Sequence, residues 1–141
     1  MAKIHYYDIF TDAPGVQPVV GVALSDLRQQ RWSQEIGRRL YDLKMAVEAH
    51  LARIQDERSR LLTLYARTGD DGQKIEVKRW EDLADRQAFD SDWADFLSSE
   101  FEVAGIPFEA AKDRNLLGDT WAAPIWEFTP TPPKKEESAG A

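Results

Sequence analysis

Cysteine is missing from the 141-residue sequence, and its absence excludes disulfide bonds, zinc sites with thiolate ligands and cysteine nucleophiles. No apolar run approaches the roughly 20 residues that a membrane-spanning helix needs. The start of the sequence also lacks the apolar stretch of a signal peptide. We therefore expect a cytoplasmic protein that does not bind membranes and that folds as one domain, which suits this length.

Asparagine and methionine are also scarce, since the chain contains a single asparagine, Asn115, and two methionines. A low content of asparagine, methionine and cysteine is a tendency of thermophilic proteins. A mesophile with a GC-rich genome would show the same bias, so both origins stay open.

Residues that perform catalytic or metal chemistry are few. The two histidines, His5 and His50, stand in no spacing that predicts a Ser-His-Asp arrangement. The acidic residues of 90–95 offer the oxygen ligands that hard cations prefer, and residues 70–72 resemble the start of a calcium loop without its closing glutamate. The glycines are isolated and form no phosphate-binding loop. We therefore expect no catalytic residue, cofactor, metal ion or small-molecule substrate.

The clearest element of the sequence is a long amphipathic helix over residues 33–66. Ser33 is a favourable N-cap, and glycines from Gly69 onward are expected to end the helix. Gly37 and the polar stretch 55–60 are the points at which it would bend if it is not continuous. Apolar residues recur along it at three- and four-residue steps, namely Ile36, Leu40, Leu43, Val47, Leu51, Ile54, Leu61 and Tyr65.

A second amphipathic helix is predicted over residues 88–101, because large apolar residues share one face there. These residues are Phe89, Trp93, Phe96, Leu97 and Phe101.

Residues 19–31 fit two predictions. We favour an extended piece that passes into a short helix capped by Ser25, and the alternative is a short helix that begins at Gly21.

Short strands complete the predicted fold. Residues 3–10 are rich in β-forming residues, and residues 73–79 alternate polar and apolar side chains as a half-buried strand does. Residues 102–108 are expected to be extended, with breaks at Gly105 and Pro107. The predicted fold class is α+β and helix-dominated, with one long amphipathic helix packed with a second helix and a small sheet of short strands.

The domain boundary is expected near the C-terminus. Residues 109–128 predict short helix or loop, and the single globular domain is predicted to span residues 1–128. Residues 129–141 are rich in proline, lysine and glutamate and predict a disordered tail.

Acidic residues are concentrated in one stretch of the chain. Residues 81–102 contain eight acidic residues and one basic residue, so their charge of −7 equals the net charge of the whole chain. A field of one sign steers partners of the opposite sign. This stretch disfavours direct binding of nucleic acid, which requires positive charge against the phosphates, and favours a basic protein partner.

Aromatic residues lie among these acidic residues and are typical anchors of protein interfaces. The partner-binding residues predicted here are Asp90, Asp92, Trp93 and Asp95. The alternative is that the aromatic residues pack on the long helix and the carboxylates face solvent. Trp121 and Trp126 form a second candidate partner site, and their alternative is to fold back onto the core.

The order of these patterns resembles a group of small tailed-bacteriophage proteins. The resemblance covers residues 24–128 and depends on hydrophobic spacing and one turn. Its elements are the apolar stripe of the long helix, the turn Asp71-Gly72, the pattern Phe89-x-x-x-Trp93-x-x-x-Leu97 and the segment Glu100-Phe-Glu-Val103. The resemblance implies no established catalytic residue.

The size and acidity are also similar to those of the small proteins with which Thermus phages redirect host RNA polymerase. That likeness implies binding near the flap and the sigma subunit of the polymerase. We therefore expect a non-enzymatic, phage-encoded regulator that binds a host protein, with RNA polymerase as the first candidate, in the host cytoplasm. A virion structural or assembly protein is the alternative, and an enzyme of unrecognised type is a third hypothesis.

Overall fold

Helix α2, Gln34–Leu64, is the longest element of the computed structural model, which describes residues 1–127. As predicted, the hydroxyl of Ser33 accepts a hydrogen bond of 3.3 Å from the backbone N–H of Ile36 and caps the helix. The 31 residues form one continuous helix, which corresponds to about 46 Å at about 1.5 Å per residue.

Helix α2 ends earlier than its glycines predict. The ammonium group of Lys74 donates hydrogen bonds of 3.0 and 3.1 Å to the carbonyl oxygens of Leu64 and Ala66. A lysine in this place satisfies carbonyl groups that the end of a helix leaves without partners. The side chain of Lys74 therefore stabilises the chain reversal that follows α2.

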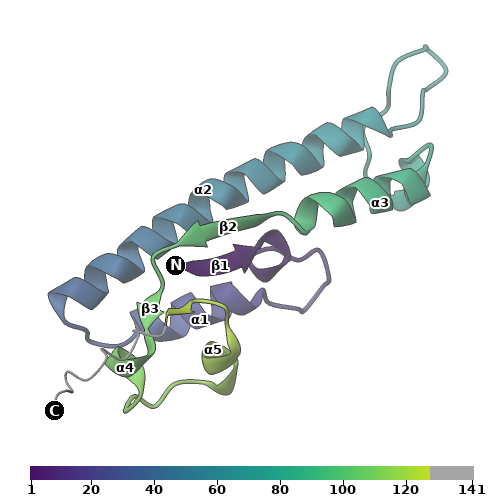
Figure 1. Cartoon of the computed structure of the whole chain (residues 1–141). Helices are drawn as coiled ribbons and strands as arrows, with labels where there is room; N and C mark the ends of the chain where they lie inside the picture. Colours follow the sequence, from purple (N-terminus) through teal and green to yellow (C-terminus); the bar gives the residue numbers. More distant parts are fainter. Residues whose placement is uncertain (128–141) are drawn as a thin grey trace, which may run out of the picture.

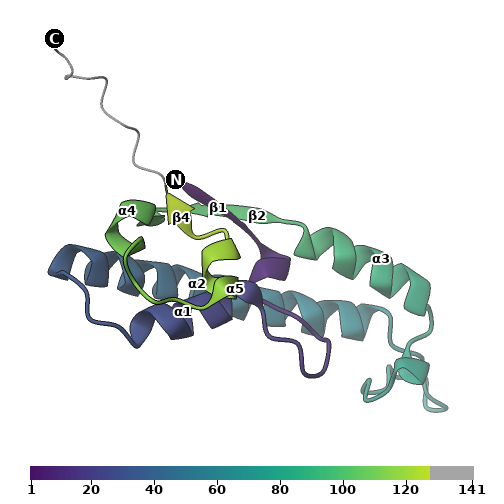
Figure 2. The same ribbon diagram turned by 90° about the horizontal axis from the view of Figure 1, so that it is seen from below.

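A pair of strands and a second helix lie along one side of α2 (Figure 1). Strands β1 (Ala2–His5) and β2 (Glu100–Val103) are antiparallel, with Ile4 opposite Phe101. Helix α3 (Arg86–Leu97) packs against the C-terminal half of α2, and α1 (Val19–Arg28) packs beside its N-terminal half (Figures 1 and 2). The largest fully buried side chains among these layers are Phe89, Ile4, Leu27, Leu43, Ile54 and Leu61.

The C-terminal segment forms a second small unit against α1. Its two short strands pair in parallel, and its second helix packs on α1. The elements are β3 (Ile106–Pro107), α4 (Phe108–Ala111), α5 (Gly118–Ala122) and β4 (Trp126–Glu127). The α+β, helix-dominated fold predicted from the sequence is therefore confirmed.

Several contacts attach this segment to the rest of the protein, and two of them involve Asp26 and Gly105. The carboxylate of Asp26 in α1 accepts hydrogen bonds of 2.9 Å from the backbone N–H of Leu117 and 2.8 Å from the hydroxyl of Thr120. The backbone at Gly105 lies so close to the segment before β4 that a Cβ atom at residue 105 would lie 2.7 Å from the carbonyl oxygen of Ile125. A glycine is needed at this position for steric reasons.

The predictions for the N-terminal part need two corrections. The strand predicted over residues 3–10 stops at His5, and Tyr6–Asp8 form the 3₁₀ turn η1. The favoured prediction for residues 19–31, an extended piece before a short helix, is wrong, because helix α1 already begins at Val19. The helix is favoured over an extended structure because it buries apolar residues that stand at helical spacing. These residues are Val20, Ala23, Leu24 and Leu27.

The strand predicted over residues 73–79 is also wrong. This segment makes one isolated bridge, between Lys74 and Thr68, and β1 and β2 pair with each other instead. The backbone N–H groups of Lys78 and Arg79 donate to the carboxylate of Asp82, in the 3₁₀ turn η2 (Trp80–Asp82), at 2.9 and 3.1 Å. An alternating pattern does not form a strand without a neighbouring strand to pair with.

The second helix is shorter than predicted. Helix α3 ends at Leu97, and Phe101 lies in β2, because the chain must turn to pair with β1. The predicted domain end at Phe128 and the predicted tail over residues 129–141 lie outside the described residues.

Candidate protein-binding surface

The buried side of α3 is aromatic. Phe89 is 1% exposed and Trp93 is 7% exposed, and their rings stack with centroids 6.4 Å apart. The indole N–H of Trp93 donates a 3.0 Å hydrogen bond to Asp12, whose other carboxylate oxygen lies 3.1 Å from Nε of Arg58 in α2. Trp93 is therefore a core residue that is linked through Asp12 to Arg58 of α2. Because its ring is buried, it is not available as the contact residue that the sequence predicted.

Three exposed positions of α3 are acidic. Asp90, Asp92 and Asp95 are all exposed, as the predicted binding surface requires. Asp90 lies 3.5 Å from the guanidinium of Arg86 one turn earlier in the helix. Asp92 accepts a hydrogen bond from the hydroxyl of Tyr65, and this bond raises the pKa of Tyr65 above its ordinary value. The alternative weighed from the sequence, with aromatic residues inside and carboxylates outside, describes α3 correctly.

A groove of about 280 Å³ lies along the junction of α3 with α2. It is lined by Glu57, Arg60, Leu61, Asp92, Asp95, Phe96 and Ser99, and we call this set the acidic groove. Glu57 belongs to α2, whereas Asp92 and Asp95 belong to α3. The acidic stretch 81–102 therefore supplies only part of the negative charge of the groove.

One arginine partly balances the acidic groove. The guanidinium of Arg60 donates hydrogen bonds of 2.9 and 2.7 Å to the two carboxylate oxygens of Glu57. This bidentate contact lowers the pKa of Glu57 below its ordinary value, so this carboxylate is ionised at neutral pH. Because Asp92 and Asp95 remain beside this pair, the groove has more acidic than basic side chains and suits a cationic side chain of a partner.

The tryptophans of the C-terminal cluster fold onto the protein. The rings of Trp121 and Trp126 stack with centroids 5.1 Å apart, and Phe108 lies 5.3 and 6.1 Å from them. The indole N–H of Trp126 donates a 2.9 Å hydrogen bond to the carbonyl oxygen of Thr120. Both tryptophans are half-buried, so the alternative in which they fold back onto the core is favoured.

The two predicted sites lie at opposite ends of the molecule. Helix α3 lies at one end, and α4, α5 and β4 lie at the other (Figures 1 and 2). The structure therefore brings Asp92 and Asp95 together and pairs Trp121 with Trp126, but it does not join the acidic and tryptophan sites into one surface.

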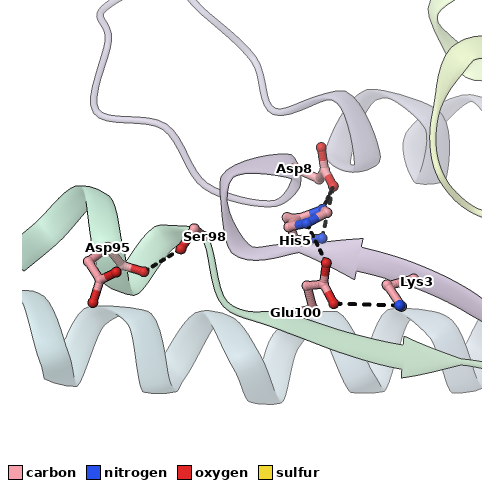
Figure 3. Close-up of polar contacts among 6 residues, drawn as sticks. All are labelled: Lys3, His5, Asp8, Asp95, Ser98 and Glu100. Atoms are coloured by element: carbon pink, nitrogen blue, oxygen red, sulfur yellow. Dashed lines mark hydrogen bonds and ion pairs between the residues drawn. The ribbon is translucent and has the colours of Figure 1, made fainter.

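A polar cluster connects β1 with β2 (Figure 3). Nε2 of His5 lies 2.7 Å from the carboxylate of Glu100, and Nδ1 lies 3.7 Å from Asp8, so both ring nitrogens face carboxylates. The Ser98 hydroxyl lies apart from them and donates a 2.6 Å hydrogen bond to the carbonyl oxygen of Asp95. The groups are therefore not arranged as a nucleophile with its base.

His50 packs against aromatic side chains of the fold. Its ring stacks on Phe101 at 4.0 Å, and its Nδ1 shares a 2.8 Å hydrogen bond with the hydroxyl of Tyr6. Burial, and then the nearby Arg53, lower the pKa of His50. The ring is therefore neutral at physiological pH and serves packing.

Within residues 1–127, no group of three or more histidine, aspartate or glutamate side chains is arranged to hold a metal ion. No helix of this part of the chain has the length and apolar character needed to cross a membrane. The chain matches no protein-family model, no curated protein and no solved structure.

Proposed function

We propose that this protein is a non-enzymatic, phage-encoded regulator that binds a basic surface of a host protein through the acidic groove. RNA polymerase is the first candidate partner, and the protein would act in the host cytoplasm. The observation that supports this proposal is the convergence of Glu57, Asp92 and Asp95 from two helices on one groove.

The physical argument depends on where the charge lies. The stretch 81–102 has the whole net charge of −7, and its carboxylates on α3 are exposed at one end of the molecule. A field of one sign accelerates encounter with a surface of opposite sign. Protein surfaces that bind nucleic acid are basic, so a protein that binds nucleic acid offers a complementary partner.

The test is capture from a thermophilic bacterial lysate with the tagged protein, followed by mass spectrometry of the retained proteins. The double variant Asp92→Lys/Asp95→Lys is compared with the wild type. The matched control is Asp113→Lys/Asp119→Lys, which makes the same change in net charge at exposed positions in the C-terminal segment.

We expect RNA polymerase subunits to dominate the wild-type and control samples and to be lost from the Asp92→Lys/Asp95→Lys sample. Retention of no host protein by the wild type would count against the regulator hypothesis. Equal retention by both double variants would show that the acidic groove is not the binding surface.

A virion structural or assembly protein is the second candidate function, and the exposed side of the long helix α2 favours it. This hypothesis predicts a high-order oligomer in light scattering and the presence of the protein in purified particles. A protein that is monomeric and absent from particles would contradict it.

A further inference from the structure

One side of α2 faces away from the rest of the protein. The strands, α1 and α3 lie on its other side (Figures 1 and 2). Two large apolar side chains remain uncovered there, since Tyr41 is 58% exposed and Met45 is 45% exposed. The exposed residues that define this outer face are Arg38, Asp42, Met45, Ala49, Ala52, Arg53 and Asp56, with Tyr41 at its border.

The charges of the outer face differ from the other charges of α2. Elsewhere on the helix Glu35 lies near Arg39, Lys44 pairs with Glu48, Glu57 pairs with Arg60, and Arg58 pairs with Asp12. In contrast, the four charged side chains of the outer face form no ion pair with any residue of the described part of the chain. They are available to a partner.

The order of these charges is self-complementary. Along the helix the outer face has the basic Arg38, the acidic Asp42, an apolar centre, the basic Arg53 and the acidic Asp56. Consider two α2 helices that pack antiparallel through their outer faces, with the two-fold axis crossing each helix at the level of residue 47. Arg38 of each copy then faces Asp56 of the other. In the same register Asp42 faces Arg53. A parallel pair in register would place each charge against its own kind, which is unfavourable.

We propose that the outer face of α2 is the interface of a two-fold homodimer in which the α2 helices of two copies pack antiparallel. Met45 and Ala49 lie at its centre, and the small side chain of Ala49 allows the helices to approach closely. Four intermolecular ion pairs, two of each kind, flank this centre. The acidic groove lies toward α3, so this proposal and the proposed function fail independently.

The size of the interface sets the strength that we expect. The face from Arg38 to Asp56 is about 28 Å long at about 1.5 Å per residue. A single helix pair is smaller than the standard interface of about 800 Å² per partner. The dimer should therefore dissociate on dilution, and because a two-fold contact is closed it should not grow into larger assemblies.

Sedimentation velocity of the full chain over a range of concentrations tests the dimer and its charge pattern. Arg53→Asp places two carboxylates opposite each other twice per dimer, and we expect dimerisation to weaken about tenfold. The double variant Asp42→Arg/Arg53→Asp exchanges the two charges and should restore dimerisation. Arg31→Asp, at an exposed position before α2, is the matched control and should dimerise as the wild type does.

Cross-linking gives a second readout that does not remove any charge. Because the chain contains no cysteine, Ala49→Cys introduces one defined thiol near the two-fold axis. A short bis-maleimide should convert this variant to covalent dimer, whereas Ser91→Cys, exposed on α3, should yield no covalent dimer. A wild type that stays monomeric at all concentrations, or a dimer that Arg53→Asp leaves unchanged, would overturn the proposal.

Discussion

Tryptophans occur at both ends of this molecule, but the two ends use them differently. At the α3 end Trp93 is buried against Phe10 and Phe89, and exposed positions of the same helix are acidic. At the C-terminal end Trp121 and Trp126 stack on each other in a corner between short elements and stay half-buried. The comparison teaches that a tryptophan on a regular amphipathic helix belongs to the core, and that the neighbouring carboxylates are the exposed groups.

The largest difference between the two ends should appear in stability. Trp93→Ala removes a buried ring and the hydrogen bond to Asp12, and should lower the free energy of unfolding by about 3–5 kcal/mol. Trp126→Ala removes a half-buried ring and should cost about 1–2 kcal/mol. Urea denaturation followed by circular dichroism measures both. Equal losses would contradict the assignment of the two tryptophans to different environments.

The attachment of the C-terminal end should be sensitive to one glycine. Gly105→Ala introduces a Cβ atom 2.7 Å from the carbonyl oxygen of Ile125 and should lower the free energy of unfolding by about 1–3 kcal/mol. Gly118→Ala is the matched control, because a Cβ atom at that position meets no atom within 4 Å. Thermal denaturation should leave the control unchanged or slightly stabilised. A Gly105→Ala variant as stable as the control would refute the close approach.

A smaller and more local effect is expected at Asp26. Asp26→Ala removes the acceptor for Leu117 and Thr120 and should cost about 1–2 kcal/mol. Hydrogen exchange should rise over residues 117–127 while α3 stays protected. Asp26→Asn keeps one acceptor oxygen and should lie between the wild type and the alanine variant. Uniform loss of protection would mean that the two ends do not unfold separately.

The smallest effect concerns the acidic side of α3. The hydrogen bond to Asp92 raises the pKa of Tyr65, so its contribution to stability is present at neutral pH and is lost as pH rises through the raised pKa. Asp92→Asn should move the titration of Tyr65 toward lower pH. The difference in tyrosinate absorbance between the two proteins measures this shift. Identical titration curves would show that Asp92 does not hold the Tyr65 hydroxyl.

The sequence predicts local features well where one helix face decides them. Ser33 and the apolar spacing after it locate α2 to within one residue at its N-terminus and two residues at its C-terminus. The same reasoning fails for α1, because the β-branched Val19, Val20 and Val22 favour a strand until the burial of one helical face decides the outcome. It fails for residues 73–79 because pairing depends on a neighbouring strand that the local pattern does not reveal.

The acidic groove was predicted in part. Asp92 and Asp95 stand out in the sequence because their stretch contains the whole net charge. Glu57 and Arg60 were missed, since they lie in a nearly neutral helix and reach the groove only when α2 and α3 pack together. Trp93 was predicted as a contact residue but is buried, and its four-residue spacing from Phe89 already indicates that both rings share the buried face.

The most direct test of the central claim is the binding of purified host RNA polymerase to the immobilised protein at low and high salt. We predict that the wild type binds, that salt weakens the binding, and that Asp92→Lys/Asp95→Lys abolishes it while Asp113→Lys/Asp119→Lys does not. Absence of binding by the wild type, or binding that is insensitive to both salt and charge reversal at Asp92 and Asp95, would contradict the proposal that the acidic groove binds the polymerase.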